Sequence, residues 1–145
     1  MGFAMRQDFN YGEFVKRGSF RHEYINGKKN GFSFQAILGY YRGHYLSDID
    51  LLEVWLDGSK LPDEAVSFEL NGKELPVWKL KYAVTEFWSQ VTPATIHAIL
   101  PGGVSAGEHE LELKLMLRVP YMQIGPEHNF MPLDSGEKCT IEVAE

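Results

Sequence analysis

The sequence predicts an all-β fold: an antiparallel two-sheet β-sandwich, jelly-roll-like, with at most one short helix. Three observations predict it. Turn signals recur about every ten residues, the segments between them alternate apolar and polar side chains, and no amphipathic helix is available to connect parallel strands. The chain has 145 residues with no evident repeat or linker, so we predict a single domain over residues 1–145.

Alternation with a period of two residues predicts the individual strands, because successive side chains of a strand point to opposite faces. The clearest case is 109–118, where every second residue from 111 to 117 is leucine. The apolar run 94–100 predicts a strand at the centre of a sheet, and 76–83 is ambiguous between a short helix and a strand. Further strands are predicted within 32–38, 52–56, 66–70 and 138–143, with tight turns at Asn26-Gly27, Asp57-Gly58 and Asn71-Gly72.

Composition and charge exclude several classes of function. The net charge is −6 and the basic residues are scattered, which argues against nucleic-acid binding because phosphates require clustered Lys and Arg. A single cysteine, Cys139, cannot form an internal disulfide and fits a reducing cytoplasm. The first ten residues have no signal-peptide pattern, and no stretch reaches the roughly 18 apolar residues of a membrane span.

The residue types that carry chemistry do not form a recognisable motif. The histidines show no metal-ligand spacing, and Cys139 on its strand is predicted to be packed rather than nucleophilic. His109 is predicted as a core histidine at a strand end, and His97 as a surface residue. Acid pairs such as Asp48 with Asp50 are interpreted as solvated. We therefore predict no catalytic, cofactor-binding or metal-binding residue on this chain.

The segment 39–47 combines three tyrosines, an arginine and two glycines in nine residues. Tyrosine and arginine are enriched at protein interfaces, which suggests that Tyr40, Tyr41, Arg42 and Gly43 contact a partner or a ligand. The alternative is a strand end and bend in which Tyr40 is buried and Arg42 is solvated. The residues alone leave both interpretations open.

The segment 119–133 is predicted to be an extended apolar loop. Prolines at 120, 126 and 132 argue against a central strand, yet the segment is too apolar to remain uncovered. It must cover either its own sheet or a partner, and we expect partner contact. The residues expected to contribute are Tyr121, Met122, His128 and Phe130.

Six groups of short motifs follow one another through the middle of the chain. They are Gly31-Phe32-Ser33-Phe34; Tyr40-Tyr41-Arg42-Gly43 with Leu46-Ser47; Val54-Trp55-Leu56-Asp57-Gly58; Pro93-Ala94-Thr95-Ile96; Gly102-Gly103-Val104 with Gly107-Glu108-His109-Glu110-Leu111; and Arg118-Val119-Pro120-Tyr121-Met122. In order and spacing, over roughly residues 30–123, this set resembles the small β subunit of bacterial C-glycoside deglycosidases.

The resemblance implies a β-sandwich that binds a larger α subunit similar to a sugar-phosphate isomerase TIM barrel. The α subunit would hold a divalent metal, manganese, and the catalytic base. The hetero-oligomer would cleave the carbon–carbon bond of 3-oxo-C-glycosides, such as flavonoid glycosides, by proton abstraction and β-elimination. This chain would then be the accessory, non-catalytic subunit of a cytoplasmic lyase, with no cofactor of its own.

Two other functions are compatible with the residues. A stand-alone carbohydrate-binding module would present Tyr41, Trp55 or Trp88 as an exposed stacking platform. A self-sufficient metalloenzyme of the jelly-roll type would bring His22, His44 or His128 together around a metal.

Overall fold

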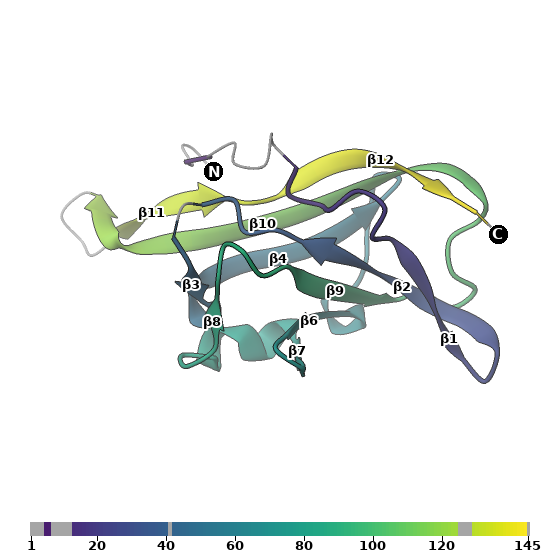
Figure 1. The fold of residues 1–145 in the computed structure, drawn as a ribbon, viewed down its shortest axis with the longest axis horizontal. Coiled ribbons are helices and arrows are strands. Elements are labelled where there is room, and N and C mark those ends of the chain that lie inside the picture. Colours follow the sequence, from purple (N-terminus) through teal and green to yellow (C-terminus); the bar gives the residue numbers. More distant parts are fainter. Residues whose placement is uncertain (1–4, 7–12, 41, 125–128, 145) are drawn as a thin grey trace.

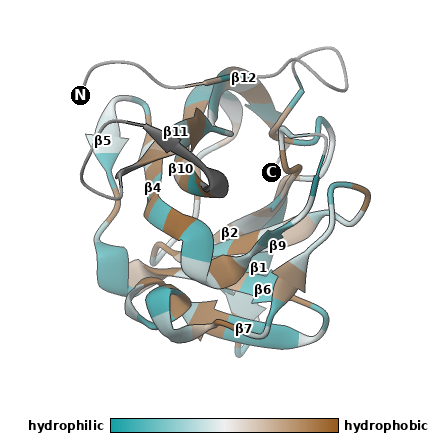
Figure 2. Cartoon of the chain, turned by 90° about the vertical axis from the view of Figure 1, so that its left-hand side faces the viewer, coloured by the Kyte–Doolittle hydropathy of each residue, from teal (hydrophilic) through white to brown (hydrophobic). Residues whose placement is uncertain are grey.

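The computed structural model describes residues 5–6, 13–40, 42–124 and 129–144, in which two large antiparallel sheets face each other (Figure 1). The strands are β1 (Arg21–Ile25), β2 (Lys28–Ala36), β3 (His44–Tyr45), β4 (Ile49–Leu56), β5 (Ser59–Lys60), β6 (Val66–Leu70), β7 (Lys73–Pro76), β8 (Phe87–Trp88), β9 (Ala94–Ile99), β10 (Gly107–Ile124), β11 (Asn129–Asp134) and β12 (Glu137–Val143). One sheet has the order β1–β2–β9–β6–β7, and the other has the order β11–β10–β4–β5, with β12 also paired to β10. Seen end-on, the two sheets are separate layers (Figure 2), which confirms the predicted fold class.

The three predicted tight turns connect β1 to β2, β4 to β5 and β6 to β7. Asn26, Asp57 and Asn71 have φ values of 53°, 50° and 53°, and the glycine after each is also positive, at 77°, 82° and 80°. Positive φ at both central positions defines the type I′ turn, whose twist matches that of the two strands it joins. These dipeptides therefore set the hairpin registers locally.

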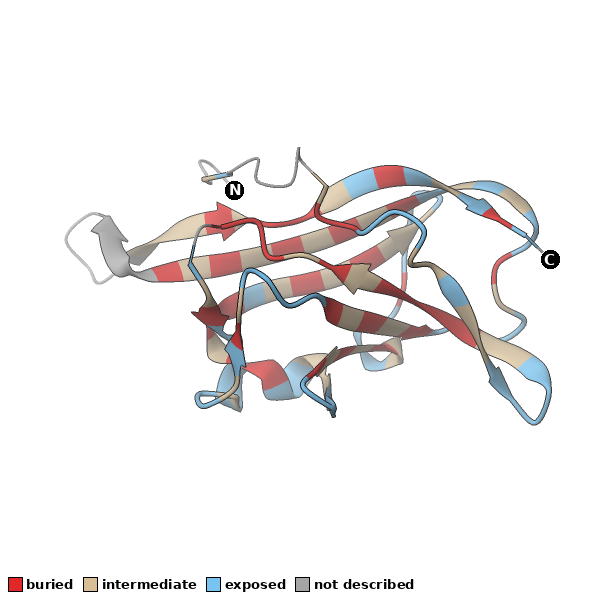
Figure 3. Cartoon of the chain, in the orientation of Figure 1, coloured by how far each residue is buried: buried red, intermediate tan, exposed pale blue. Residues whose placement is uncertain are grey.

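The core lies between the sheets and is built from alternate residues of each strand. Along β10, Leu111, Leu113, Leu115 and Leu117 are all at most 1% exposed, and the residues between them are only partly buried (Figure 3). The run predicted to be a central strand is β9, which lies between β2 and β6. Cys139 on β12 is buried, as predicted.

Short 3₁₀ helices connect some of the strands: η2 (Leu46–Asp48), η3 (Asp63–Ala65) and η4 (Val77–Tyr82). The ambiguous segment 76–83 is therefore resolved in favour of a helix, η4, which buries Leu80. No helix in the described part of the chain is long and apolar enough to cross a membrane.

The prediction of an extended loop over 119–133 was wrong. Strand β10 continues to Ile124, and β11 begins at Asn129. The prolines are tolerated for two reasons. Pro120 lies where the β10–β11 register shifts, between Val119 and Gln123. Pro132 lies in an edge strand, and its carbonyl accepts a hydrogen bond from Met5 at 2.8 Å. Its missing N–H therefore faces away from β10, and no bond of that ladder is lost.

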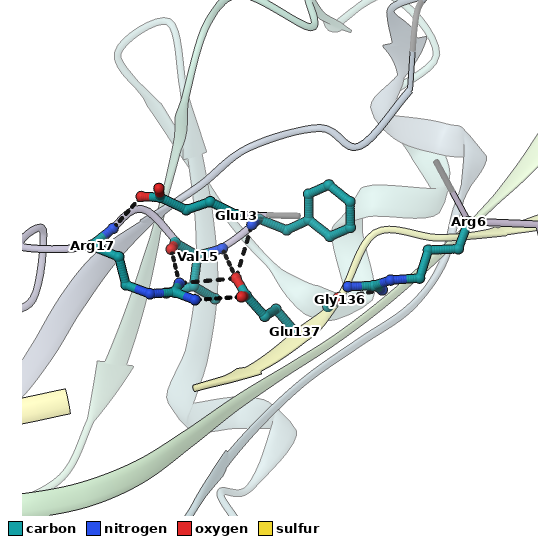
Figure 4. Close-up of polar contacts among 7 residues, drawn as sticks. Arg6, Glu13, Val15, Arg17, Gly136 and Glu137 are labelled. Atoms are coloured by element: carbon teal, nitrogen blue, oxygen red, sulfur yellow. Dashed lines mark hydrogen bonds and ion pairs between the residues drawn. The ribbon is translucent and has the colours of Figure 1, made fainter. Parts of the chain in front are cut away.

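The segment before β1 joins the two sheets. The backbone of Phe14 and Lys16 pairs with Ile37 and Gln35 beyond and within β2, at 2.8 and 2.9 Å. On its other side, the Glu137 carboxylate of β12 accepts hydrogen bonds from the amide N–H groups of Phe14 and Val15, each at 2.8 Å. It also accepts hydrogen bonds from the Arg17 guanidinium (Figure 4). A single carboxylate therefore holds this segment between the layers.

Candidate functional site

Strands β3 and β8 form a separate two-stranded sheet at the end of the sandwich where β10 ends and β11 begins (Figure 1). His44 pairs with Trp88, and Tyr45 pairs with Phe87. Because successive side chains of a strand alternate, one pair points inward and the other outward. His44 and Trp88 are accordingly 2% and 0% exposed, whereas Tyr45 and Phe87 are each 47% exposed.

The inward pair anchors this small sheet in the core. The Trp88 indole N–H donates to the Thr92 carbonyl at 2.7 Å, and its ring meets Phe68 edge-on with the centroids 5.2 Å apart. The Tyr40 ring lies 5.3 Å from that of His44. Neither His44 ring nitrogen has a hydrogen-bond partner within the described residues. Burial lowers the pKa of His44, and the nearby Arg42 backbone only partly opposes this, so the imidazole is neutral at neutral pH.

The outward pair forms an aromatic contact on the surface. The rings of Tyr45 and Phe87 meet edge-on, with their centroids 5.1 Å apart and an interplanar angle of 73°. Gly43 makes this arrangement possible, since a Cβ there would lie 2.5 Å from the Phe87 ring and 2.7 Å from the Trp88 carbonyl oxygen. The glycine therefore allows the chain before β3 to pass directly beneath Phe87.

Helix η4 and the residues around β8 carry further exposed apolar side chains at this end of the molecule. Trp78 and Tyr82 are each 65% exposed, while Leu80 between them is buried. The Ser47 amide bonds the Ala83 carbonyl at 3.2 Å, and the Leu46 amide bonds that of Glu86 at 2.9 Å, so η4 and β8 are tied to η2 and β3. We use the term aromatic surface for Tyr45, Trp78, Tyr82, Val84, Phe87 and Val91, six of the nine exposed large apolar side chains found among the described residues.

Basic side chains lie along the edge of the aromatic surface. The Lys81 ammonium lies 5.2 Å from the centre of the Tyr82 ring, and the Lys79 ammonium lies 6.0 Å from that of Trp78. Arg42, just before β3, is exposed. An apolar centre with a charged rim is the usual composition of a protein–protein interface.

Arg118 of β10 attaches this end of the molecule to the second sheet. Its guanidinium donates to the Ser47 carbonyl at 2.7 Å and pairs with Asp50 at 3.0 Å. Asp48 is 9% exposed, so its predicted solvation is wrong. Burial raises the pKa of Asp48, and the Arg118 charge only partly opposes this. The interpretation failed for Asp48 because η2 turns this side chain inward.

Comparison with known proteins places this architecture in a family. A family model described as C-glycoside deglycosidase beta subunit matches residues 11–121. The chain belongs to this family. The match extends further toward the N-terminus than the motifs noted in the sequence, and it includes every residue of the aromatic surface.

Individual relatives are similar to the chain at about 30% identity. The C-glycoside deglycosidase beta subunit of Eubacterium cellulosolvens is 31% identical over 97 residues, which are 67% of this chain and 66% of that protein. That of Arthrobacter globiformis is 29% identical over 108 residues, 74% of this chain and 82% of the relative. A Microbacterium protein named 3'-dehydrocarminate deglycosidase beta subunit is 30% identical over 97 residues, 66% of this chain and 72% of the relative. The alignment thus spans just under two thirds of the Eubacterium protein.

The predicted interface residues of this β-subunit family member lie in different environments. Tyr40 is 1% exposed and packs beneath β3, whereas Arg42 is exposed and Gly43 is half-buried. Phe130 on β11 is half-buried at the same end of the molecule. Tyr41 and His128 lie outside the described residues, and Tyr121 and Met122 are described only through the backbone of β10.

Sequence reasoning missed Trp78, Tyr82 and Phe87, although they form most of the aromatic surface. Their signal was the concentration of aromatic residues in 78–88, in a region whose periodicity was ambiguous between helix and strand. The structure also bears on the two alternative functions, the carbohydrate-binding module and the metalloenzyme. Trp88 is fully buried and cannot form an exposed stacking platform. His22 on β1 and His44 on β3 lie at opposite ends of the sandwich, so they do not converge on a metal (Figure 1).

Proposed function

We propose that this chain is the accessory subunit of a heteromeric C-glycoside deglycosidase and that its aromatic surface binds the larger, catalytic subunit. Family membership supports the first part, because the family and the relatives are named as beta subunits. The aromatic surface is the observation that carries the second part. Exposed apolar side chains gathered at one place are costly in water and mark a site that a partner covers.

The residue types of the aromatic surface fit this use. Tyrosine and tryptophan dominate the energetics of protein interfaces because they bury a large area and lose little conformational entropy. Tyr45 and Phe87 are held by backbone pairing, and Gly43 removes the Cβ that would displace Phe87. The surface is therefore organised before binding, which lowers the entropy cost of association.

In the proposed reaction, the larger subunit supplies the chemistry. It would hold a divalent metal, manganese, that stabilises the enediolate formed from a 3-oxo-C-glycoside, and a base that removes the proton beside the carbonyl. β-Elimination would then break the carbon–carbon bond, with its electron pair leaving on the aglycone carbon, which takes up a proton. The present chain would cover and shape that site, with Arg42 and Phe130 near the entrance.

Co-purification with a co-expressed larger subunit tests the proposal. Trp78→Ala and Tyr82→Ala each remove a side chain that is 65% exposed, so we expect little change in the free energy of unfolding. An interface hot spot costs about 2 kcal/mol when truncated, so each variant is expected to weaken binding about 30-fold in calorimetry or surface plasmon resonance.

Tyr24→Ala is the matched control. Tyr24 is also an exposed aromatic residue, at 57%, but it lies in the β1–β2 hairpin at the far end of the sandwich. Its replacement is expected to leave the affinity unchanged. If the wild-type chain does not bind the larger subunit, or if it cleaves a 3-oxo-C-glycoside alone at the rate of the assembly, the proposed function is wrong. Equal affinities of the wild type and the three variants would show that the aromatic surface is not the interface, while leaving the proposed subunit role intact.

A further inference from the structure

A second group of polar side chains lies on the outer face of the sheet β1–β2–β9–β6–β7. His97 of β9 is at its centre. The Nδ1 atom of His97 lies 2.8 Å from a carboxylate oxygen of Glu23 on β1, and its Nε2 atom lies 2.6 Å from one of Glu69 on β6. Glu74 of β7 completes the group: one ligand atom each of Glu69, Glu74 and His97 lie within 4.8 Å of one another.

Among the described residues, no lysine or arginine forms an ion pair with the carboxylates of Glu23, Glu69 or Glu74. Glu69 and Glu74 are direct cross-strand partners in the β6–β7 ladder, and like charges in that position repel. A pocket of about 470 Å³ beside them is lined by Glu23, Glu64, Glu74 and His97, and its lining, as described, contains no lysine or arginine. The nearest lysine in sequence, Lys73, pairs instead with Glu86 at 2.8 Å. The site therefore attracts a cation.

The orientation of His97 further limits what that cation can be. A neutral imidazole carries one N–H, yet both of its nitrogens face carboxylate oxygens. When Nδ1–H donates to Glu23, the Nε2 lone pair faces Glu69, and a positive charge must separate them. Burial alone would lower the pKa of His97, but Glu69 and Glu23 outweigh it and raise the pKa, so a proton can fill this position.

A divalent cation can take the place of that proton once Nε2 and the Glu69 oxygen move apart from 2.6 Å, because metal–ligand bonds are about 2.0–2.2 Å long. Protonation of His97 leaves the four-residue group of three glutamates and one histidine at a formal charge of about −2, whereas a divalent ion on neutral His97 leaves about −1. A histidine whose second ring nitrogen is held by a carboxylate is also the common arrangement of metal-binding histidines. Glu23 fills that role here, and the Ser67 hydroxyl orients Glu74 by donating to it at 2.6 Å.

We propose that Nε2 of His97 and the carboxylates of Glu69 and Glu74 bind a divalent transition-metal ion of the zinc type, with Glu23 orienting the imidazole. One imidazole and two carboxylates match the ligand preferences of zinc and its neighbours rather than the all-oxygen sites of calcium or magnesium. The ion would connect β9, β6 and the edge strand β7, so its binding would stabilise the fold. The proposal does not depend on the proposed function, because every ligand belongs to this chain.

Calorimetric titration of the full chain with ZnCl₂, after chelator treatment and removal of any affinity tag, tests the site. We expect one zinc ion per chain and a rise in the melting temperature with zinc. Glu23→Gln is expected to weaken zinc binding 10- to 100-fold, as removal of an outer-shell carboxylate does, and Glu74→Gln is expected to weaken it at least as much. MgCl₂ in place of ZnCl₂ is expected to bind far more weakly.

His109→Asn is the matched control. His109 also pairs with a carboxylate, Asp57 at 2.6 Å, but it lies on β10 in the other sheet. Its replacement is expected to leave zinc binding unchanged, whereas zinc is expected to shift the ¹⁵N resonance of His97 Nε2 in the wild-type chain. Circular dichroism shows whether each variant is folded, and Glu69→Gln replaces any variant that is not. Absence of zinc binding, or equal affinity in Glu23→Gln, Glu74→Gln and the wild type, would refute the site.

Discussion

Replacing Glu137 by glutamine is expected to loosen the segment that joins the two sheets. In the wild-type protein, one carboxylate oxygen accepts the amide N–H groups of Phe14 and Val15 and one N–H of Arg17 at 3.0 Å. The other oxygen accepts a second N–H of the same guanidinium. The Glu137 side chain is 12% exposed, so water replaces these bonds poorly. Glutamine has the same shape but no charge and only one acceptor oxygen.

The expected loss in the free energy of unfolding follows from the hydrogen bonds that change. A hydrogen bond to a charged group contributes about 1.5–3 kcal/mol, roughly twice a neutral one. Glutamine keeps the amide contacts at the weaker, neutral strength and turns an NH₂ group toward Arg17. Because the Arg17 side chain is 48% exposed, part of its pairing energy is lost to solvent screening. We therefore expect a loss of about 2–3 kcal/mol in the free energy of unfolding.

The effect of Glu137 is also expected to depend on pH. Burial acts to raise the pKa of Glu137, but the hydrogen bonds from Arg17, Val15 and Phe14 outweigh it, and the net shift lowers the pKa from 4.5. A carboxyl group with a lowered folded-state pKa stabilises the protein fully above its unfolded-state value. That stability is lost as the pH falls below 4.5 and through the folded-state pKa. The difference between wild type and Glu137→Gln should shrink over the same range.

Urea denaturation at neutral pH and at a series of pH values below 4.5 measures both effects. Glu142→Gln, an exposed position on the same strand, is the control and is expected to change stability by less than about 0.5 kcal/mol. If Glu137→Gln costs no more than this control, or if its cost is the same at every pH, the carboxylate does not hold the segment as argued.

Two further substitutions test the packing beneath the aromatic surface. Gly43→Ala places a Cβ 2.5 Å from the Phe87 ring, so β3 and β8 must separate; we expect a loss of about 1–3 kcal/mol in urea denaturation and weaker binding of the larger subunit, and unchanged values of both would contradict the close approach. Phe68→Ala removes a fully buried ring that packs on Trp88; we expect a loss of about 3–5 kcal/mol and a red-shifted tryptophan emission, whereas Trp78→Ala, at an exposed position, should leave the stability nearly unchanged.

Tyr40 and Tyr45 show where prediction from the sequence stopped. Both belong to the tyrosine-rich segment, yet Tyr40 is 1% exposed and Tyr45 is 47% exposed. Which tyrosine faces solvent depends on the pairing of β3 with β8, whose partner residues lie about forty positions away along the chain. Periodicity within the segment carries no information about that pairing, so both interpretations of Tyr40 remained open.

The zinc-type site was missed for a related reason. His97 was predicted as a surface residue, and its strand face is indeed the outer one, but its side chain is only 16% exposed. The carboxylates that surround it come from three other strands, β1, β6 and β7. No spacing in the sequence marks such a group, because metal-ligand motifs are recognisable only when the ligands share one local element.

The sequence by itself determined the strands with regular alternation, which are β2, β4, β6, β9, β12 and most of β10, together with the tight turns and the family. Leucines at every second position of β10 and the Asn-Gly and Asp-Gly dipeptides act through side-chain alternation and backbone φ, which are properties of neighbouring residues. Only the tertiary structure decided which side chains of separate strands meet: Tyr45 with Phe87 on the aromatic surface, and His97 with its glutamates. Those contacts depend on strand order and register across the sheets, and they exist only once distant strands have paired.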